Sequence, residues 1–245
     1  MIDVRHLSIS YEGSPVLTDM TFRVAKGTIL GVVGAGGVGK SVLLKLLCGL
    51  IQPDDGDVQI DGLSIRGLDD DALADLRRRM GMLFQNYALF DFMTVGENVA
   101  FPLEQAREDS PQDIQAKVSE RLSEVGLPGI ERMYPRELSG GMKKRVSLAR
   151  ATIAGANILL YDDPAAGLDP VTSSKIFSLI RRLHSSEGVS VVVSHDIDRM
   201  VGVCDEWLVL HQGRIWFMGD VHAVRASNDP VIATLFDTQP QEAVR

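Results

Sequence analysis

Eight residues near the start of the chain have the types and spacing to hold phosphate groups. They are Gly34, Ala35, Gly36, Gly37, Val38, Gly39, Lys40 and Ser41, and they fit the pattern G-x-x-x-x-G-K-[ST]. The glycines let backbone N–H groups surround phosphate oxygens, and a following helix adds partial positive charge at its N-terminus. Lys40 would then reach the β- and γ-phosphates, and the Ser41 hydroxyl would bind Mg²⁺. The pattern therefore predicts a nucleotide-binding loop.

The residues on either side of this loop supply the context that the pattern requires. An apolar run at 28–33 precedes the loop and indicates a strand. Leucines at helical spacing follow it and predict a helix up to about Leu50. The alternative interpretation is a plain glycine turn between a core strand and a core helix.

A second candidate for chemistry is the pair of carboxylates at the end of an apolar strand, 158–161. In a protein with a phosphate loop, Asp162 at this position would hold the Mg²⁺ shell. Asp163 would orient the attacking water or accept its proton. The alternative is a simple Asp-Asp-Pro turn at the end of the strand.

A third candidate is the segment Ser139, Gly140 and Gly141, which precedes a helical pattern. Ser139 is a plausible N-cap, and the two glycines expose backbone N–H groups at the start of the helix. The segment therefore predicts a second anion-binding helix end. The alternative is an ordinary capped helix, on which Lys143, Lys144 and Arg145 form only a solvated face.

The composition narrows the class of protein. Apolar residues make up 45% and charged residues 24% of the 245 residues, as in ordinary globular proteins. The net charge of -8 argues against a general nucleic-acid binder. Cys48 and Cys204 lack metal-ligand spacing. The first residues do not resemble a signal peptide, and no stretch approaches the roughly 20 apolar residues of a membrane span. Any membrane role is therefore expected to go through a partner.

Alternating strand and helix patterns predict a parallel sheet. Strands are predicted at 2–9, 16–24, 28–33, 58–60, 81–84, 158–161 and 189–193, and a closing hairpin at 207–211 and 214–218. Helices are predicted at 70–79, 171–186 and 230–236, with a helical stretch at 95–154 inserted between sheet elements. Turns are expected at 12–15 and 53–57.

The order of these motifs resembles the ATP-binding cassette (ABC) ATPases. The sequence LSGGM at 138–142, followed by KKRVSLARA, is similar to the signature of that family. As in the family, it lies between the phosphate loop and the carboxylate pair. The resemblance implies that Ser139, Gly140 and Gly141 bind the ATP held by a second copy of the chain.

Four further positions match family marks in the expected order. The resemblance implies that Tyr11 stacks on adenine and that His195, the switch histidine, contacts the γ-phosphate. It also implies that Gln85, the Q-loop glutamine, acts in catalysis and in the Mg²⁺ shell. The segment 166–169 matches the D-loop, which places Asp169 at the nucleotide site.

Three positions depart from the usual pattern of the family. Asp163 stands where the family normally has Glu. Val42, at the end of the phosphate loop, replaces a Ser or Thr whose hydroxyl reaches the α-phosphate. Gly36 replaces a common Ser or Asn. These changes bear on the rate of hydrolysis and the strength of nucleotide binding, and leave the fold as expected.

A narrower resemblance concerns the cargo. The segment 86–103, Met142 in the signature, and the tail segment 227–230 with Phe236 are similar to the Mla-type lipid-transport ATPases. Polar amino-acid importer ATPases resemble the region 86–103 too, although they usually carry a glutamine-rich signature.

Together these patterns predict an α/β P-loop NTPase with an antiparallel β-subdomain. A single domain is expected at 1–236, with a helical subdomain at about 87–155 and a flexible tail at 237–245. By resemblance, a homodimer binds ATP and Mg²⁺ and drives a separate integral-membrane permease in lipid transport, with no nucleic acid partner. It would lie in the cytoplasm on the inner face of the cell membrane. The alternatives are an importer of polar amino acids or other small solutes, and a soluble non-transport ATPase of the iron–sulfur assembly type.

Overall fold

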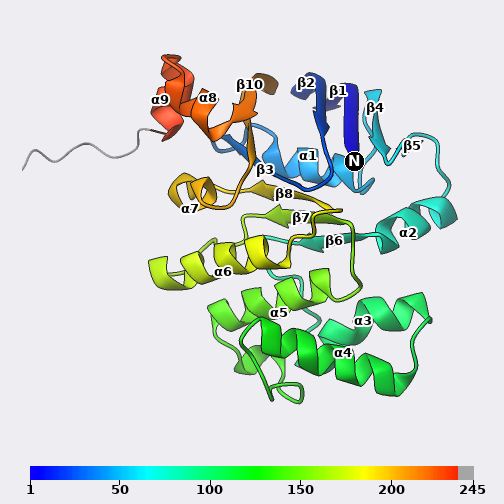
Figure 1. Ribbon diagram of the computed structural model, residues 1–245. Coiled ribbons are helices and arrows are strands. Elements are labelled where there is room, and N and C mark those ends of the chain that lie inside the picture. The colour runs from blue at the N-terminus through cyan, green and yellow to red at the C-terminus, as the bar shows by residue number, and fades with distance from the viewer. Residues whose placement is uncertain (237–245) are drawn as a thin grey trace, which may run out of the picture.

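Two β-sheets organise the residues that the computed structural model describes, 1–236 (Figure 1). The predicted flexible tail at 237–245 lies outside these residues. One sheet has six strands in the order β10-β9-β3-β8-β7-β6, and the other has four in the order β2-β1-β4-β5. An α/β protein with an additional antiparallel sheet was expected, and this part of the prediction is confirmed.

The six-stranded sheet is parallel in its centre. Its strands are β3 (Thr28–Gly34), β6 (Met80–Leu83), β7 (Ile158–Asp162), β8 (Val189–Val193), β9 (Glu206–His211) and β10 (Arg214–Asp220). The strands β9, β3, β8, β7 and β6 run parallel to their neighbours, and β10 pairs antiparallel with β9. The parallel sheet and the closing hairpin are therefore both confirmed.

The smaller sheet contains β1 (Ile2–Tyr11), β2 (Ser14–Val24), β4 (Asp55–Ile60) and β5 (Leu63–Ser64), all antiparallel. The predicted turn at 53–57 is wrong from Asp55 onward, because β4 already begins there. Asp55 pairs with Ser8 and Asp57 with Arg5. Pairing with β1 thus overrides the local turn preference of this acidic, glycine-containing segment.

Ten helical segments lie in the described residues. They are α1 (Lys40–Leu47), α2 (Asp70–Arg78), α3 (Val95–Ala106), α4 (Pro111–Glu124), the 3₁₀ helix η1 (Pro135–Glu137), α5 (Gly140–Thr152), α6 (Pro170–Leu183), α7 (Ile197–Val201), α8 (Val221–Ala226) and α9 (Pro230–Phe236). As predicted, α3, α4 and α5 are inserted between two neighbouring strands, β6 and β7. The helices α7 and α8 were not predicted.

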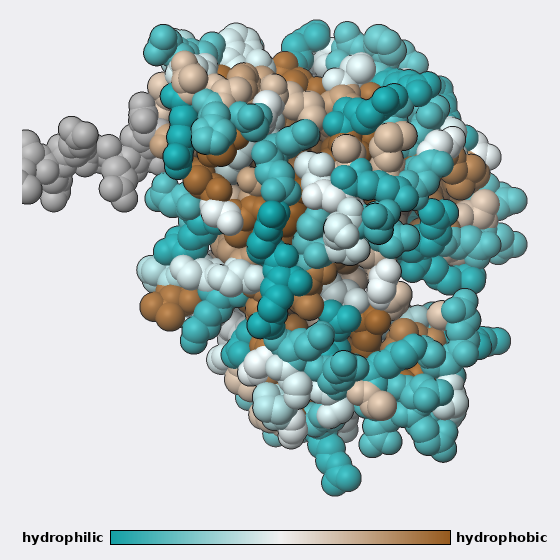
Figure 2. Space-filling view, viewed as in Figure 1, coloured by the Kyte–Doolittle hydropathy of each residue, from teal (hydrophilic) through white to brown (hydrophobic). Residues whose placement is uncertain are grey.

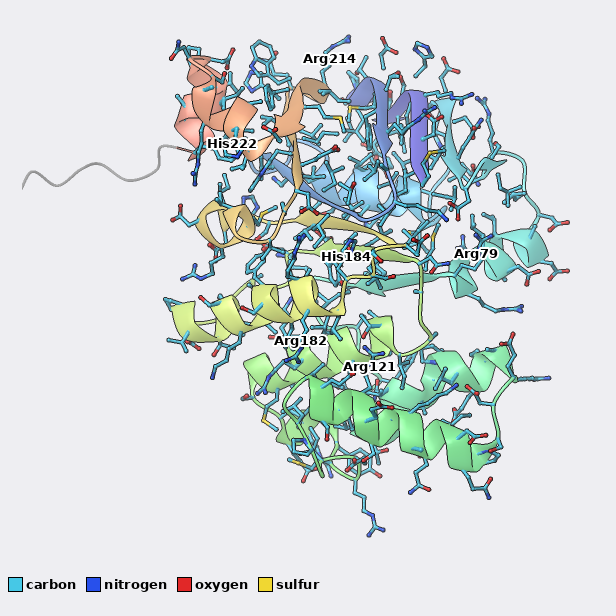
Figure 3. All side chains as sticks on the ribbon, viewed as in Figure 1. Arg79, Arg121, Arg182, His184, Arg214 and His222 are labelled. Atoms are coloured by element: carbon cyan, nitrogen blue, oxygen red, sulfur yellow. The ribbon has the colours of Figure 1, made fainter. Side chains whose placement is uncertain are left out.

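Two predicted helix ends lie too far along the chain. The helix α1 ends at Leu47 because Gly49 takes a left-handed conformation, with φ of 66°, as is common just after a helix. The helix α6 ends at Leu183 because the backbone of His184 is extended. The His184 ring, labelled in Figure 3, lies 2.9 Å from the Ser190 hydroxyl of β8.

Two hydrophobic cores lie on opposite faces of the six-stranded sheet. Successive residues of a strand point to opposite faces, so Leu30 and Val32 pack with Leu43 of α1, whereas Ile29 and Val33 share a core with Val146 of α5. Figure 1 shows α1 on one side of the sheet and α5 and α6 on the other. The viewed surface is mainly hydrophilic, with smaller hydrophobic areas (Figure 2). None of the described helices has the length and apolar character to cross a membrane.

Candidate functional site

The carboxyl ends of four neighbouring parallel strands bring the predicted residues to one edge of the sheet. The strand β3 leads into the phosphate loop, β6 into Gln85, β7 into Asp163, and β8 into His195. In open α/β sheets, ligands bind at this edge, beyond the carboxyl ends of the strands. The sheet order therefore brings together residues that lie up to 161 positions apart in the sequence, from Gly34 to His195.

Glycines of the phosphate loop take backbone conformations with positive φ. Gly39 caps α1 with φ of 104°, and a Cβ atom there would lie 2.6 Å from Leu17 Cδ2. No side chain caps α1, so its first N–H groups are available to an anion. A Cβ atom added at Gly36 or Gly37 would meet no described atom within 4 Å, so this side of the loop is open.

Lys40 is buried beneath the loop. Its Nζ donates to the carbonyl oxygens of Gly34 and Ala35, both at 2.8 Å. Burial lowers the pKa of Lys40, and the carboxylates of Asp163 and Asp162 oppose this shift. An ammonium that is hydrogen-bonded to two carbonyl groups can exchange these partners for phosphate oxygens, which are stronger acceptors.

Ser41 and Asp162 form the part of the site that fits Mg²⁺. The Ser41 hydroxyl donates to Asp162 Oδ1 at 2.9 Å, across 121 residues of sequence. Burial raises the pKa of Asp162, the Ser41 hydrogen bond lowers it, and the adjacent Asp163 charge raises it. Mg²⁺ is commonly bound by one or two carboxylates together with substrate phosphates. The described residues contain no group of three or more His, Cys, Asp or Glu that could hold a metal without such phosphates.

Asp163 follows β7 in a left-handed conformation, with φ of 45°. Its backbone N–H donates to the Val193 carbonyl at 2.8 Å, and its Oδ1 accepts from the Ser194 hydroxyl at 2.9 Å. Asp163 and the exposed His195 line one open pocket of about 370 Å³, together with Ala165, Ala166, Ser194 and Asp196. The predicted base and the predicted switch histidine therefore share a pocket large enough for water and a phosphate group.

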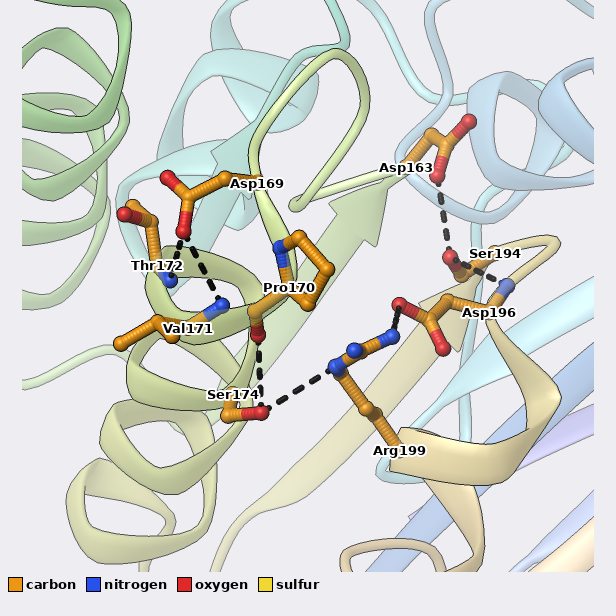
Figure 4. A network of polar contacts seen from close by, with 9 residues as sticks. All are labelled: Asp163, Asp169, Pro170, Val171, Thr172, Ser174, Ser194, Asp196 and Arg199. Carbon is orange, nitrogen blue, oxygen red and sulfur yellow. Dashed lines mark hydrogen bonds and ion pairs between the residues drawn. The ribbon is translucent and has the colours of Figure 1, made fainter.

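A chain of polar contacts extends from this pocket to α6 (Figure 4). The Ser194 hydroxyl accepts from the Asp196 N–H at 3.2 Å, and Arg199 contacts the Asp196 carboxylate at 2.5 Å. Arg199 Nε then donates to the Ser174 hydroxyl at 3.1 Å. Ser194 was not predicted as part of the site, although a hydroxyl residue directly after a buried strand is a signal that could have found it.

Asp169, the predicted D-loop residue, caps α6. Its Oδ1 accepts from the N–H groups of Val171 and Thr172, both at 3.0 Å (Figure 4). The hydrogen bonds with Thr172, followed by that from Val171, lower the pKa of Asp169. The structure thus gives Asp169 a capping role in addition to its predicted place near the nucleotide.

The signature segment begins α5, as predicted. Ser139 is exposed, and its hydroxyl accepts from the Met142 N–H at 3.3 Å. Gly141 lies so close to α6 that a Cβ atom there would be 2.7 Å from Thr172 Cγ2. Within the described residues, no hydrogen bond joins the segment 139–141 to the phosphate loop. Gly140 is the first residue of the helix, so its N–H is available to an anion.

The remaining predicted residues lie at the margins of the site. Tyr11 ends β1 with 48% of its surface exposed, as a residue stacking on a base requires. The side chain of Gln85 is exposed. Val42 is half-buried and packs against the core around α1, and it provides no hydroxyl. Val38, within the phosphate loop, packs against the same core.

Lys144 differs most from expectation. The alternative interpretation of 143–145 as a solvated basic face is wrong for Lys144, because its side chain is completely buried. Burial lowers its pKa to about 8, against the opposing charges of Asp163 and Asp162. The three basic residues at 143–145 are alike in the sequence, which therefore does not indicate that only one of them is buried. In the structure, Lys143 and Arg145 remain partly exposed.

Comparison with known proteins assigns these motifs to a common family. Residues 17–166 match the family described as ABC transporter. The protein TRIGALACTOSYLDIACYLGLYCEROL 3 of Arabidopsis thaliana is 37% identical over 250 residues, which covers 95% of this chain and 72% of that protein. The intermembrane phospholipid transport system ATP-binding protein MlaF of Escherichia coli K12 is 35% identical over 238 residues, covering 97% of this chain and 88% of MlaF.

Two further matches broaden the comparison. The methionine import ATP-binding protein MetN of Carboxydothermus hydrogenoformans is 39% identical over 219 residues, covering 88% of this chain and 65% of MetN. Among solved structures, the dimeric ATP-binding cassette MJ0796 in a post-hydrolysis state with ADP and Pi has a TM-score of 0.84. It is 29% identical, and the match covers 90% of this chain and 99% of that one.

Proposed function

The chain belongs to the ABC transporter family as an ATP-binding subunit, and from this premise we propose that it hydrolyses ATP to drive lipid transport through a separate permease. The observation that carries the ATPase part is the convergence of the phosphate loop, the Ser41–Asp162 pair and the Asp163–His195 pocket at one sheet edge. Phosphoryl transfer needs positioning and charge stabilisation more than covalent help from the protein. This set of groups supplies both.

Each predicted residue has a role in this proposal. The phosphate loop and Lys40 hold the β- and γ-phosphates. Ser41, Asp162 and Gln85 hold Mg²⁺, which neutralises the developing charge on the phosphates when bound. Asp163, held by Ser194, orients the attacking water, and His195, which lines the same pocket, contacts the γ-phosphate.

The ATP site is complete only in a dimer of two copies of the chain. Ser139, Gly140 and Gly141 lie at the start of α5, which packs on the opposite face of the sheet from α1. A second copy is therefore proposed to supply these residues to the γ-phosphate. The dimeric state of the MJ0796 cassette supports this arrangement.

Residues 1–236 are proposed to act as one ATPase unit. The part at 87–155 would be its helical subdomain and would face the permease together with Gln85. The subunit would lie in the cytoplasm at the inner face of the membrane, attached through the permease. The names of MlaF and MetN, which are both ATP-binding proteins of transport systems, support this placement.

Phospholipid or a related lipid is the proposed cargo. The name of MlaF, together with its match over 97% of this chain, supports this choice. The second candidate is import of an amino acid, because MetN is 39% identical. A non-transport ATPase of the iron–sulfur assembly type is the third alternative, and it requires that no permease partner exist.

A single comparison tests the three alternatives. A strain lacking this chain is measured for detergent sensitivity, for phospholipid distribution in the envelope and for methionine uptake, with the wild-type gene or a Lys40→Met variant supplied in trans. Lipid transport predicts an envelope defect that the wild type corrects and the variant does not. Lost methionine uptake with a normal envelope would establish the importer function instead. Neither defect, with no association with membranes, would favour the non-transport ATPase.

A further inference from the structure

One face of α5 binds the backbone of the segment that follows β6. Lys144 Nζ donates to the Gln85 carbonyl at 2.7 Å, the Ser147 hydroxyl to the Tyr87 carbonyl at 2.9 Å, and Arg150 Nη1 to the Ala88 carbonyl at 2.7 Å. The three donors are spaced three residues apart and therefore share a helix face. The segment 85–88 is thus attached to α5 by a row of side-chain donors.

The backbone of this segment takes a conformation that needs such support. Tyr87 has φ of 61° and Ala88 has φ of 51°. Residues other than glycine rarely adopt positive φ, and they hold it only where the surroundings impose it. The carbonyls of these two residues are the acceptors for Ser147 and Arg150. The donors on α5 therefore stabilise the bent path of the loop that carries Gln85.

Lys144 differs from the other two donors because it has a second partner. Its Nζ also donates to the Asp163 carbonyl at 3.1 Å. The Tyr87 ring lies across the ammonium, with Nζ 5.2 Å from the ring centroid. A completely buried ammonium is stable only when its charge is compensated, and here two carbonyl groups and an aromatic face do so. One side chain thus joins the loops after β6 and β7.

We propose that Lys144 is a positioning residue that holds the Gln85 and Asp163 loops together, so that both loops move with the start of the signature helix. The effect on hydrolysis rests on the proposed function, in which Asp163 orients the attacking water. Lys144 contacts the backbone of Asp163, and in this proposal it acts on hydrolysis only through that backbone. Its removal would release the Asp163 backbone from its left-handed conformation and shift the carboxylate.

The matched variants are Lys144→Met and Lys143→Met. Methionine keeps most of the apolar stem of lysine and removes the ammonium. Lys143 is the adjacent residue, and its Nζ lies 5.9 Å from the Tyr87 ring centroid with no hydrogen bond among the described residues. Lys144→Arg is the conservative variant, because a guanidinium keeps the charge and several donors.

The first measurement is amide hydrogen exchange of the full chain without nucleotide, so it does not depend on activity. Lys144→Met is expected to speed exchange about tenfold in the segments 85–88 and 163–166, where local opening becomes easier, with no change in Lys143→Met. Unchanged exchange in both segments would overturn the proposal, whether or not the protein hydrolyses ATP.

The second measurement is steady-state ATP hydrolysis by folded protein. A shifted carboxylate is expected to lower kcat by about 10- to 100-fold, with KM for ATP within about twofold, because ground-state binding is untouched. Lys144→Arg should recover part of kcat. If Lys144→Met loses activity only in proportion to lost folded protein, or no more than Lys143→Met, the positioning role is wrong. An inactive wild type would instead count against the proposed function.

Discussion

At the scale of single residues, Asp163 is the position that we expect to limit the rate of hydrolysis. Its carboxylate stands roughly 1.5 Å further back than that of the usual Glu, since one C–C bond is missing. Catalytic contacts to water lie at about 2.6–3.2 Å, so this difference matters. The Ser194 hydroxyl holds Oδ1 at 2.9 Å, and the left-handed backbone places the residue in the lining of the pocket. We expect slow hydrolysis by the isolated subunit, with Val42 adding to the effect.

The corresponding prediction uses two substitutions at this position. Asp163→Glu is expected to raise kcat several-fold, because the longer side chain brings the carboxylate to the water. Asp163→Asn is expected to lower kcat, by up to about 10²–10⁴-fold if the carboxylate accepts the proton. The measurement is phosphate release from Mg²⁺-ATP, with nucleotide binding as the control. If Asp163→Glu is equal to wild type or slower, the site is built around the shorter acid.

At the scale of elements, three helices of the candidate site differ in how their first N–H groups are capped. No side chain caps α1, whereas Ser139 caps α5 and Asp169 caps α6. The first N–H groups of a helix need an acceptor. In α5 and α6 a side chain accepts hydrogen bonds from some of these N–H groups. In α1 no side chain does so, which leaves its first N–H groups available to a phosphate group. The uncapped start of α1 therefore supports its proposed place in the nucleotide site.

A bulky substitution at Ser139 tests the role of the signature. Ser139→Trp is expected to abolish hydrolysis and leave ATP binding by the monomer largely intact, because the phosphate loop belongs to the other side of the sheet. Loss of the cap alone should cost about 0.5–2 kcal/mol of stability. Ser110→Trp is the matched control, since Ser110 caps α4 in the same way and accepts from Asp113 N–H at 3.2 Å. Equal loss of hydrolysis in both variants would show that Ser139 acts only as a helix cap.

The cap of α6 predicts a pH dependence of stability. The hydrogen bonds from Thr172 and Val171 lower the pKa of Asp169 in the folded state. This contribution to stability is therefore complete above the unfolded pKa, about 3.9, and is lost as pH falls through the lower folded value. Asp169→Ala should lower the melting temperature at pH 7, and the difference from wild type should shrink below pH of about 4. Asp169→Asn, which can still cap, serves as control. A difference that stays constant down to acid pH would contradict the assignment.

At the scale of the whole molecule, the sheet separates the phosphate loop from the signature segment, the two proposed halves of the ATP site. The phosphate loop leads into α1 on one face, and the signature leads into α5 on the other. In the proposed arrangement, a second copy of the chain supplies the missing half and closes the site. We therefore expect a monomer to bind ATP without hydrolysing it.

Assembly should therefore depend on nucleotide. We expect a weak dimer without nucleotide and a stronger one with ATP and Mg²⁺, measured by sedimentation velocity. Asp163→Asn should hold the dimer longest, because it binds ATP and hydrolyses it slowly, and Lys40→Met should stay monomeric. Full activity from a demonstrably monomeric sample would rule out this arrangement of the site.

Much of the element order could be predicted because it rests on local patterns. The apolar run before the phosphate loop, the leucines after it and the N-cap at Ser139 depend on neighbours within one or two turns. The parallel sheet could also be predicted, because the order of locally recognised strands and helices alternates along the chain. The start of β4 at Asp55 could not be predicted in this way, because it depends on pairing with Ser8 of a distant strand.

The sequence by itself determined which residues could bind phosphate and carry out the chemistry, since those motifs consist of a few adjacent residues of particular types. Only the tertiary structure decided how they meet. The sheet order places Ser41 beside Asp162, and the β7–β8 pair places Asp163 beside Ser194. The tertiary structure also buries Lys144 between the loops that carry Gln85 and Asp163, which the charge of a lysine alone would not suggest. The physical reason is that burial and long-range hydrogen bonds depend on strand order and helix packing, which no local window of sequence contains.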